Sequence, residues 1–426
     1  MKPILQVALD FLNLKRALKV AEEAVKGGAD WLEAGTPLIK SEGLKAVREL
    51  KKRFPQCKIL ADLKTMDTGR YEVEAAAKAG ADVVAILGVA DNSTIKEAIE
   101  AGKNYGCKIM VDLINVPNIE KRAREIEGLG ADYLGVHLGI DQQMSGLNPL
   151  TELKKIFGKV KIPLALAGGI NSENAGEAVR AGASIIIVGG AITKAENAQE
   201  ATQRIKKAMK LQKVIKTGLY KKYLDPKKVF QKVSTANISD ALHRAEILEG
   251  IKLRSGKKIV GRVITVRTAP GDWAKPVEAL DVAKKGEVIV IDAGGVGPAV
   301  WGELASWSAK VKNLSGVIIW GAVRDLKEIK KINFPVASKL VCSNAGEPKG
   351  FGEINTPLKI SGKLISQGDF IVADEDGVMV ISKENAVEVA NRALDVYEKE
   401  NRIREEIKRG STLSKVQELK KWERIG

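Results

Sequence analysis

The feature that most constrains the fold of this chain is an internal repeat. The segment GGADWLEAG, which begins at Gly27, is followed by three similar segments: AGADVVAILG, LGADYLGVHLG and AGASIIIVGG. The glycines that they share are Gly28, Gly80, Gly130 and Gly182, at intervals of 52, 50 and 52 residues. Self-similarity at a fixed interval indicates that one supersecondary unit is repeated along the chain.

Each copy has the pattern of an amphipathic helix that ends at a glycine and leads into a short buried strand. A further strand precedes each copy: ILQVALD, CKILADLK, CKIMVDL and IPLALAGG. Four repeats of two strand–helix units predict eight parallel strands, which close as an α/β (βα)₈ TIM barrel in about 210 residues. An open doubly wound sheet is the alternative, but no GxGxxG motif follows the first predicted strand.

The chain has 426 residues, more than one such barrel needs. From about residue 229 the pattern changes, and VGRVITVRT, GEVIVIDAGG, LSGVIIWG and DFIVADEDGVMVI are predicted strands among helices. This pattern predicts a second, layered α+β domain. We therefore expect the barrel over residues 1–212, a basic linker over residues 213–228 and the α+β domain over residues 229–426.

The formal net charge of +16 is concentrated between Gln203 and Lys232, where eleven Lys and Arg residues face a single acid, Asp225. We interpret this stretch as a solvated helix and linker that attracts anionic substrates. Nucleic-acid binding is disfavoured because the aromatic residues there form no stacking pattern. Three scattered cysteines without a CxxC pair disfavour a disulfide framework or a zinc cluster. No apolar run approaches the roughly 18 residues of a membrane helix, so we expect a cytoplasmic protein without membrane contact.

Ionisable residues follow the predicted barrel strands, at the ends where barrel enzymes carry their chemistry. They are Asp10, Glu33, Asp62, Lys64, Asp67, Asp112, His137 and Asp141. A single aspartate after a strand usually caps the next helix. So many ionisable groups at one end of the barrel, with a histidine among them, favour an active site.

Two glycine pairs, Gly168–Gly169 and Gly189–Gly190, follow the seventh and eighth strands, where many barrels bind phosphate. Their backbone amides predict a phosphorylated substrate, because glycine allows close approach to an oxyanion. The two-residue period of a strand places Asp62 and Lys64 on one face. A charged lysine beside carboxylates suits stabilisation of a developing enolate. Glu33 and Asp62, on adjacent strands, are suited to share a hard cation such as Mg²⁺.

Residues 1 to about 210 resemble the 3-hexulose-6-phosphate synthase family of the orotidine-5′-phosphate decarboxylase superfamily. The motifs that carry the resemblance are ALD, WLEAGTPLI, ILADLKTMDTG, VHLGIDQQ, LALAGGI and IIIVGGAIT, in family order. The DLKTMD wording and the HxGxDxQ run from His137 to Gln142 favour the synthase over the related 3-keto-L-gulonate-6-phosphate decarboxylase. The resemblance implies a reversible, metal-dependent aldol reaction of the ribulose monophosphate pathway. In it, formaldehyde and D-ribulose 5-phosphate give D-arabino-hex-3-ulose 6-phosphate.

The resemblance also implies a role for each residue of the barrel site. Glu33 and Asp62 would bind Mg²⁺ or Mn²⁺, and Lys64 would stabilise the enediolate. His137 would move protons, helped by Asp10 or Asp141. Asp67 would reach the site of a neighbouring subunit, because the family is dimeric. Gly168, Gly169, Gly189 and Gly190 would hold the phosphate. We expect a homodimer or a higher homo-oligomer formed through both domains.

The second domain carries one constellation of its own, GGVGPAVWGELASWSAKVKNLSGVIIWGAVRD. The amides of Gly302, Glu303 and Leu304 are expected to open a helix towards an anion. Arg324 is expected to hold a carboxylate, and Asp325 is a candidate metal ligand. The alternative is an Arg–Asp pair that stabilises its own turn.

This region resembles the family of ribonuclease activity regulator A and 4-hydroxy-4-methyl-2-oxoglutarate aldolase, through STANISDAL, GGVGPAVWGELA, GAVRD and ADEDGVMVIS. The aldolases carry an acid, twenty intervening residues and Arg-Asp; here the acid is Glu303 where Asp is usual. Trp320–Gly321 stands where the family usually has Asp-Gly. The family implies either a keto-acid aldolase or a module that binds a ribonuclease, and fold alone does not choose between them. For the barrel, the alternatives are the decarboxylase or an inactive scaffold.

Overall fold

The computed structural model describes residues 2–245, 247–417 and 419, and the chain divides into two compact units. Unit 1 consists of Met1–Lys222 and Glu398–Gly426, and unit 2 consists of Tyr223–Tyr397. The observed division therefore differs from the expected boundaries at residues 212 and 228. Residues 213–222 of the expected linker belong to the barrel unit because they pack on it, and the chain returns to this unit after unit 2.

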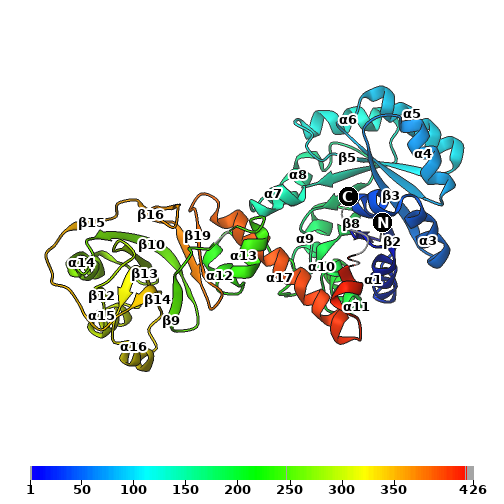
Figure 1. Ribbon diagram of the computed structural model, residues 1–426. Coiled ribbons are helices and arrows are strands. Elements are labelled where there is room, and N and C mark those ends of the chain that lie inside the picture. The colour runs from blue at the N-terminus through cyan, green and yellow to red at the C-terminus, as the bar shows by residue number, and fades with distance from the viewer. Residues whose placement is uncertain (1, 246, 418, 420–426) are drawn as a thin grey trace, which may run out of the picture. The chain divides into compact units, whose positions relative to one another are not determined.

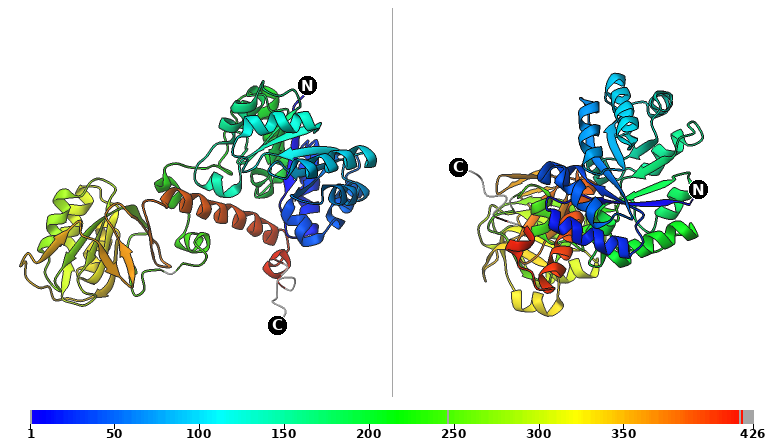
Figure 2. Two further views of the ribbon diagram at one scale, coloured as in Figure 1. Left: turned by 90° about the horizontal axis from the view of Figure 1, so that it is seen from above. Right: turned by 90° about the vertical axis from the view of Figure 1, so that its right-hand side faces the viewer.

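The described part of unit 1 contains a closed barrel of eight parallel strands in sequential order, enclosed by helices (Figures 1 and 2). The strands are β1 (Ile4–Leu9), β2 (Trp31–Ala34), β3 (Lys58–Thr65), β4 (Val83–Leu87), β5 (Lys108–Asp112), β6 (Tyr133–His137), β7 (Leu164–Ala167) and β8 (Ile185–Val188). The helices are α1 (Leu14–Lys26), α2 (Thr36–Glu42), α3 (Lys45–Arg53), α4 (Gly69–Lys78), α5 (Asn92–Tyr105), α6 (Ile119–Leu129), α7 (Ile140–Met144), α8 (Pro149–Ile156), α9 (Ala175–Arg180), α10 (Gly190–Thr193) and α11 (Ala198–Leu211). The predicted TIM barrel is confirmed.

The repeated glycines do what the sequence pattern predicts. Gly28, Gly80, Gly130 and Gly182 have φ of +98°, +100°, +94° and +102°, in the left-handed region that ends helices. In three of the four copies an aspartate follows two residues after the glycine, and these aspartates share a role. The carboxylates of Asp30, Asp82 and Asp132 accept hydrogen bonds from the backbone amides of Leu5, Ile59 and Ile109, at 2.7, 2.7 and 2.9 Å respectively. Each of these bonds joins the two strands of one repeat at their amino-terminal ends, where barrels carry stability rather than chemistry.

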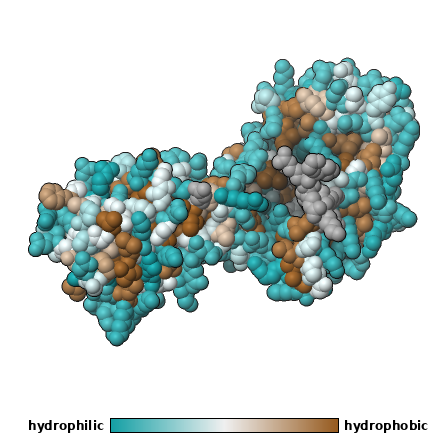
Figure 3. Space-filling model, viewed as in Figure 1, coloured by the Kyte–Doolittle hydropathy of each residue, from teal (hydrophilic) through white to brown (hydrophobic). Residues whose placement is uncertain are grey.

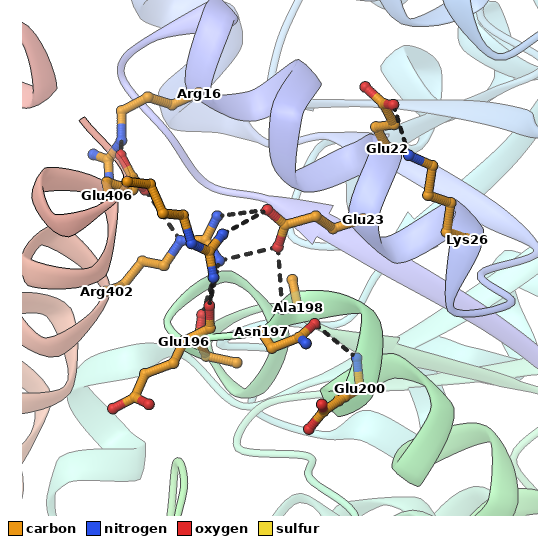
Figure 4. A network of polar contacts seen from close by, with 12 residues as sticks. Arg16, Glu22, Glu23, Lys26, Glu196, Asn197, Ala198, Glu200, Arg402 and Glu406 are labelled. Carbon is orange, nitrogen blue, oxygen red and sulfur yellow. Dashed lines mark hydrogen bonds and ion pairs between the residues drawn. The ribbon is translucent and has the colours of Figure 1, made fainter. Parts of the chain in front are cut away.

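After unit 2, the chain adds two helical segments to unit 1. They are the end of α17 (Ala386–Lys408) and α18 (Leu413–Gln417). Arg402 of α17 is 1% exposed and lies beside α1 and the start of α11 (Figure 4). Its guanidinium donates to Glu23 at 3.0 and 3.1 Å and to the carbonyls of Ala195 and Glu196 at 3.0 and 3.2 Å. Buried charges are stable only when paired in this way, so this helix end is part of the barrel unit.

Unit 2 is an α+β domain, as predicted. Among its described residues, nine strands form one sheet, and β10, β11, β13 and β14 are its parallel centre. The strands are β9 (Lys252–Ser255), β10 (Ile259–Thr268), β11 (Val288–Asp292), β12 (Ala299–Trp301), β13 (Gly316–Val323), β14 (Val336–Val341), β15 (Gly352–Ile354), β18 (Phe370–Ala373) and β19 (Val378–Ile381), with β16 (Leu358–Ile360) and β17 (Lys363–Ile365) as a separate pair.

Helices cover one face of this sheet: α14 (Ala274–Val282), α15 (Glu303–Val311) and α16 (Leu326–Ile332). The helices α12 (Pro226–Phe230) and α13 (Thr235–Ala241) pack with the start of α17 around β18 and β19.

The face drawn in Figure 3 is largely hydrophilic, with scattered apolar patches. Across the described residues, none of the helices combines the length and apolar character that crossing a bilayer requires.

Candidate functional site

A cavity of about 330 Å³ opens at the carboxyl ends of the barrel strands. It is lined by most of the residues that sequence analysis selected: Asp10, Glu33, Asp62, Lys64, Asp112, His137, Gly168, Gly169, Gly189 and Gly190. They meet because parallel strands bring their carboxyl ends to one side of a barrel. The structure leaves two selected residues outside this lining. Asp67 is exposed and accepts the amide of Thr68 at 2.7 Å, and Asp141 is exposed on α7.

Three carboxylates lie on the side of the cavity formed by β1, β2 and β3. Glu33 and Asp62 are buried, whereas Asp10 faces the open cavity from deep within the barrel mouth. Burial, followed by the charges of Asp62 and Asp10, raises the pKa of Glu33 well above its ordinary value. Burial and Asp62 likewise raise the pKa of Asp10. Three crowded carboxylates resist full ionisation unless cations lie beside them.

Neutral groups orient two of these carboxylates. Gln6 of β1 donates to Glu33 at 2.6 Å, and Thr36 of α2 donates to Asp62 at 2.8 Å. The Oε1 atom of Gln6 is buried and has no hydrogen-bond partner among the described protein groups. Neither Gln6 nor Thr36 was predicted from the sequence as a site residue. Alternate residues of a strand share one face, so Gln6 faces the barrel interior together with Ala8 and Asp10. This alternation is the signal that could have identified Gln6.

Lys64 reaches the carboxylates through an irregularity in β3. The β3–β4 register shifts between Asp62 and Thr65, and Lys64 has φ of +50°. A bulge of this kind redirects a side chain, and bulges are frequent beside active sites. The simple two-residue alternation is therefore broken here, although the conclusion drawn from it holds: Lys64 Nζ lies 3.0 Å from Asp62 Oδ2.

Asp112 links Lys64 to His137. Its Oδ2 atom lies 3.1 Å from Lys64 Nζ and 2.8 Å from His137 Nδ1, while its Oδ1 atom accepts the amide of Ile114 at 2.9 Å. Burial acts to raise the pKa of Asp112, but His137 and Lys64 outweigh it and leave this pKa below its ordinary value. Burial alone would lower the pKa of Lys64; Asp62 and Asp112 instead raise it, so the lysine stays charged.

The histidine's partner thus differs from the expected Asp10 or Asp141. An Nδ1–H donated to Asp112 leaves Nε2 of His137 as the nitrogen that can take up a proton. The position of Asp112 at the end of the fifth strand predicted that it belongs to the site. Its role as a bridge depends on β3 and β6, which bring Lys64 and His137 to it.

The glycine turns line another part of the cavity. Gly168 and Gly169 have φ of +110° and +70°, which other residues rarely adopt. A Cβ at Gly168 would lie 2.6 Å from the carbonyl oxygen of Leu138, so a side chain there would displace the backbone. Both positions therefore require glycine, and they leave backbone open to the cavity.

The donor set of the cavity fits a hard divalent cation. Magnesium in enzymes typically takes one or two protein carboxylates and completes its shell with water and substrate oxygens. Glu33 and Asp62 supply two carboxylates from adjacent strands. No group of three or more described His, Cys, Asp or Glu side chains forms a ready metal centre. A cation here would therefore need substrate or water ligands.

Unit 2 has its own cavity, of about 270 Å³, which includes the selected residues Gly302, Glu303, Leu304, Arg324 and Asp325. Asp325 Oδ2 accepts the amide of Glu303 at 3.2 Å and lies 3.5 Å from Arg324 Nε. One of the amides expected to face an anion is thus taken by the chain's own carboxylate. Gly302 leaves room for it, because a Cβ there would lie 2.6 Å from Asp325 Oδ2.

Two family models match the chain. Residues 3–205 match the orotidine 5′-phosphate decarboxylase / HUMPS family, and residues 235–380 match the aldolase/RraA family. The 3-hexulose-6-phosphate synthase of Bacillus subtilis (strain 168) is 46% identical over 203 residues, which are 47% of this chain and 96% of the relative.

Two solved structures extend the comparison. That of 3-hexulose-6-phosphate synthase from Salmonella typhimurium is 37% identical, with a TM-score of 0.48, and the match covers 50% of this chain and 100% of that one. That of the RNA-processing inhibitor RraA from Thermus thermophilis is 31% identical, with a TM-score of 0.33, and the match covers 34% of this chain and 91% of that one.

Proposed function

We propose that the barrel of this chain is a 3-hexulose-6-phosphate synthase, because its first half belongs to the orotidine 5′-phosphate decarboxylase / HUMPS family. The second half belongs to the aldolase/RraA family. It joins formaldehyde to D-ribulose 5-phosphate and also runs the reverse cleavage. The observation that carries this proposal is the contact of Lys64 with Asp62 and Asp112 in the same cavity as the glycine turns.

The condensation has two proton transfers and one new carbon–carbon bond. A base removes a proton from C1 of ribulose 5-phosphate, and the resulting enediolate attacks the formaldehyde carbon, whose oxygen then takes a proton. The charged Lys64 stabilises the negative charge of the enediolate. His137, held by Asp112, moves the protons. Asp10, whose pKa burial and Asp62 raise above its ordinary value, lines the same cavity and is a second candidate for proton transfer.

Glu33 and Asp62 are the residues that would hold Mg²⁺ or Mn²⁺. When bound, such a cation polarises the oxygens of the substrate. The glycine turns would bind the phosphate through their amides, so ribulose without its phosphate should be a very poor substrate. Comparable rates with ribulose and ribulose 5-phosphate would remove this assignment.

The direct test is formaldehyde fixation by the full-length chain with ribulose 5-phosphate and Mg²⁺, and with Lys64→Ala as the matched control. Activity that depends on Lys64 is expected. Wild-type activity no greater than that of Lys64→Ala would end the synthase proposal and leave the inactive scaffold. Release of CO₂ from 3-keto-L-gulonate 6-phosphate, measured in parallel, would identify the decarboxylase instead.

For unit 2 we propose binding of a small keto acid with a divalent cation at Arg324 and Asp325. The competing hypothesis is a module that binds a ribonuclease or another protein, in which Asp325 only caps α15. The bond from the Glu303 amide is what this competitor predicts. The exposed side chains of Arg324 and Asp325 in the lining of the cavity support the binding site. Titration of the full-length chain with Mg²⁺ plus oxalate or pyruvate, followed by its melting temperature, separates them. A rise that disappears in Asp325→Ala supports the site; no rise in the wild type removes it.

A further inference from the structure

The segment that follows the barrel, residues 213–222, packs on unit 1 and is named the arm below. Ile215 donates its amide to the carbonyl of Ser172 at 3.0 Å, and the Ser172 hydroxyl donates back to the carbonyl of Ile215 at 2.7 Å. Thr217 donates its amide to Glu173 at 3.0 Å. The arm lies beyond residues 3–205, which match the barrel family.

The arm carries Tyr220 into the lining of the barrel cavity. Tyr220 is 7% exposed and has φ of +51°, a conformation that costs free energy for a residue with a side chain. Polar contacts hold its backbone in place. Asn171 donates to its carbonyl at 3.1 Å, and its amide donates to Glu398 Oε1 at 2.8 Å. A conformation held this firmly beside a cavity indicates a functional constraint.

The ring of Tyr220 lies against the glycine turn after β8. A Cβ at Gly190 would overlap the ring, so glycine is required there for the ring to enter. Two lysines lie by the same ring: Lys222 Nζ is 4.5 Å and Lys194 Nζ is 5.2 Å from its centroid. An aromatic ring attracts a cation at such distances. Neither lysine lines the cavity, but both lie close to a ring that does, beside the Gly189–Gly190 turn to which the proposed function gives the phosphate.

We infer that Tyr220 is a positioning residue for the phosphorylated substrate, and that with Lys194 and Lys222 it completes the phosphate end of the cavity. This inference rests on the proposed function for its substrate. It adds that the barrel site is incomplete without the arm. Glu398, which is 1% exposed, orients Tyr220 from α17, so the part of the chain that follows unit 2 also supports the site.

The test uses the full-length chain with Tyr220→Ala, Tyr220→Phe and Lys222→Ala. Lys213→Ala, an exposed arm position, is the charge-matched control. Tyr220→Ala should raise KM for ribulose 5-phosphate roughly tenfold and leave kcat within about threefold, because it removes binding rather than chemistry. Tyr220→Phe keeps the ring and should stay near wild type. Lys222→Ala should also raise KM, and Lys213→Ala should not.

Calorimetric titration with inorganic phosphate gives a readout that does not require turnover. Tyr220→Ala and Lys222→Ala should weaken phosphate binding, while melting temperatures identify any variant that is merely unfolded. If Tyr220→Ala is unstable, the comparison of Lys222→Ala with Lys213→Ala decides. Unchanged KM and unchanged phosphate binding in folded variants would overturn the inference and leave the synthase proposal standing. If the variants bind phosphate more weakly but the wild type shows no synthase activity, the inference stands and the synthase proposal falls.

Discussion

At the scale of single residues, the site depends on a carboxylate shared by two cationic or protonatable groups. Asp112 contacts Lys64 and His137 through one oxygen and the backbone through the other. It fixes the orientation of both side chains, because neither can rotate away without losing a partly buried, charge-assisted hydrogen bond. Such positioning matters when a reaction needs its groups aligned.

We predict that Asp112→Asn lowers kcat by roughly a hundredfold, as expected when an electrostatic catalyst is misplaced. The asparagine is nearly isosteric, so the fold should persist. Asp132→Asn is the matched control, since Asp132 binds the Ile109 amide at the opposite end of the barrel. That control should lower stability and spare kcat. Steady-state kinetics and melting curves of both variants check this, and equal kcat in Asp112→Asn and wild type would contradict it.

Glu33 supports a second prediction, on the metal. Glu33→Gln removes a charge but keeps the shape, so it should raise the Mg²⁺ concentration needed for half-maximal activity and lower turnover by about a hundredfold. EDTA should abolish wild-type activity, and added Mg²⁺ or Mn²⁺ should restore it. Activity that survives EDTA would show that no divalent cation takes part. Glu49→Gln, on the outer helix α3, is a control of the same chemistry.

At the scale of elements, the end of α17 attaches to the barrel through buried ion pairs. Arg402 contacts Glu23 of α1 and Glu406 of its own helix, and Glu406 also contacts Arg16 at 3.0 Å. Burial acts to raise the pKa of Glu23, yet Arg402 lowers it overall. The same opposition holds for Glu406, whose pKa Arg16 and Arg402 lower.

These lowered pKa values predict an acid-sensitive attachment. A carboxylate whose pKa is lower in the folded than in the unfolded state stabilises the fold above its unfolded pKa, near 4.5 for both glutamates. That contribution should decline as the pH falls below this value. Urea unfolding of unit 1 between pH 7 and pH 3 measures it.

Arg402→Ala removes the partner that both glutamates share but leaves Arg16 beside Glu406 and Arg409 beside Glu23. It should therefore cost about 3 kcal/mol at pH 7, the lower end for broken buried pairs. It should also flatten the pH dependence below pH 4.5. Arg404→Ala, an exposed position of the same helix, is the control. Equal stability of the two variants would contradict this account of the attachment.

At the scale of the whole molecule, the order of the chain matters. The barrel comes first in the sequence, unit 2 follows it, and the last residues of the chain belong to unit 1 again. The returning segment brings Glu398 to Tyr220 and Arg402 to Glu23. A barrel cut from this chain at residue 212 would therefore lack contacts that the full chain supplies.

We predict that deletion of residues 398–426 lowers the melting temperature of the barrel by roughly 6–12 °C, from a loss of about 3 kcal/mol in a unit of this size. It should also raise KM for ribulose 5-phosphate, because Tyr220 loses its partner on α17. Deletion of residues 420–426 alone removes none of these contacts and is the control. Calorimetric scans of the two deletions check the prediction, and matching barrel transitions would refute it.

The sequence alone determined the barrel and most of the site lining. Similar segments around glycines at intervals of 52, 50 and 52 residues predict a repeated unit. Parallel strands in a closed barrel bring Asp10, Glu33, Asp62 and His137 to one end. Local patterns suffice for these features because they depend on periodicity and on which residue follows a strand.

Only the tertiary structure decided the rest. The bulge that directs Lys64, the bridge through Asp112 and the entry of Tyr220 depend on groups that are far apart in the sequence. The same holds for Asp67 and Asp141, which follow barrel strands but lie outside the cavity. A contact between distant residues reflects the packing of the whole unit, and no local periodicity encodes it.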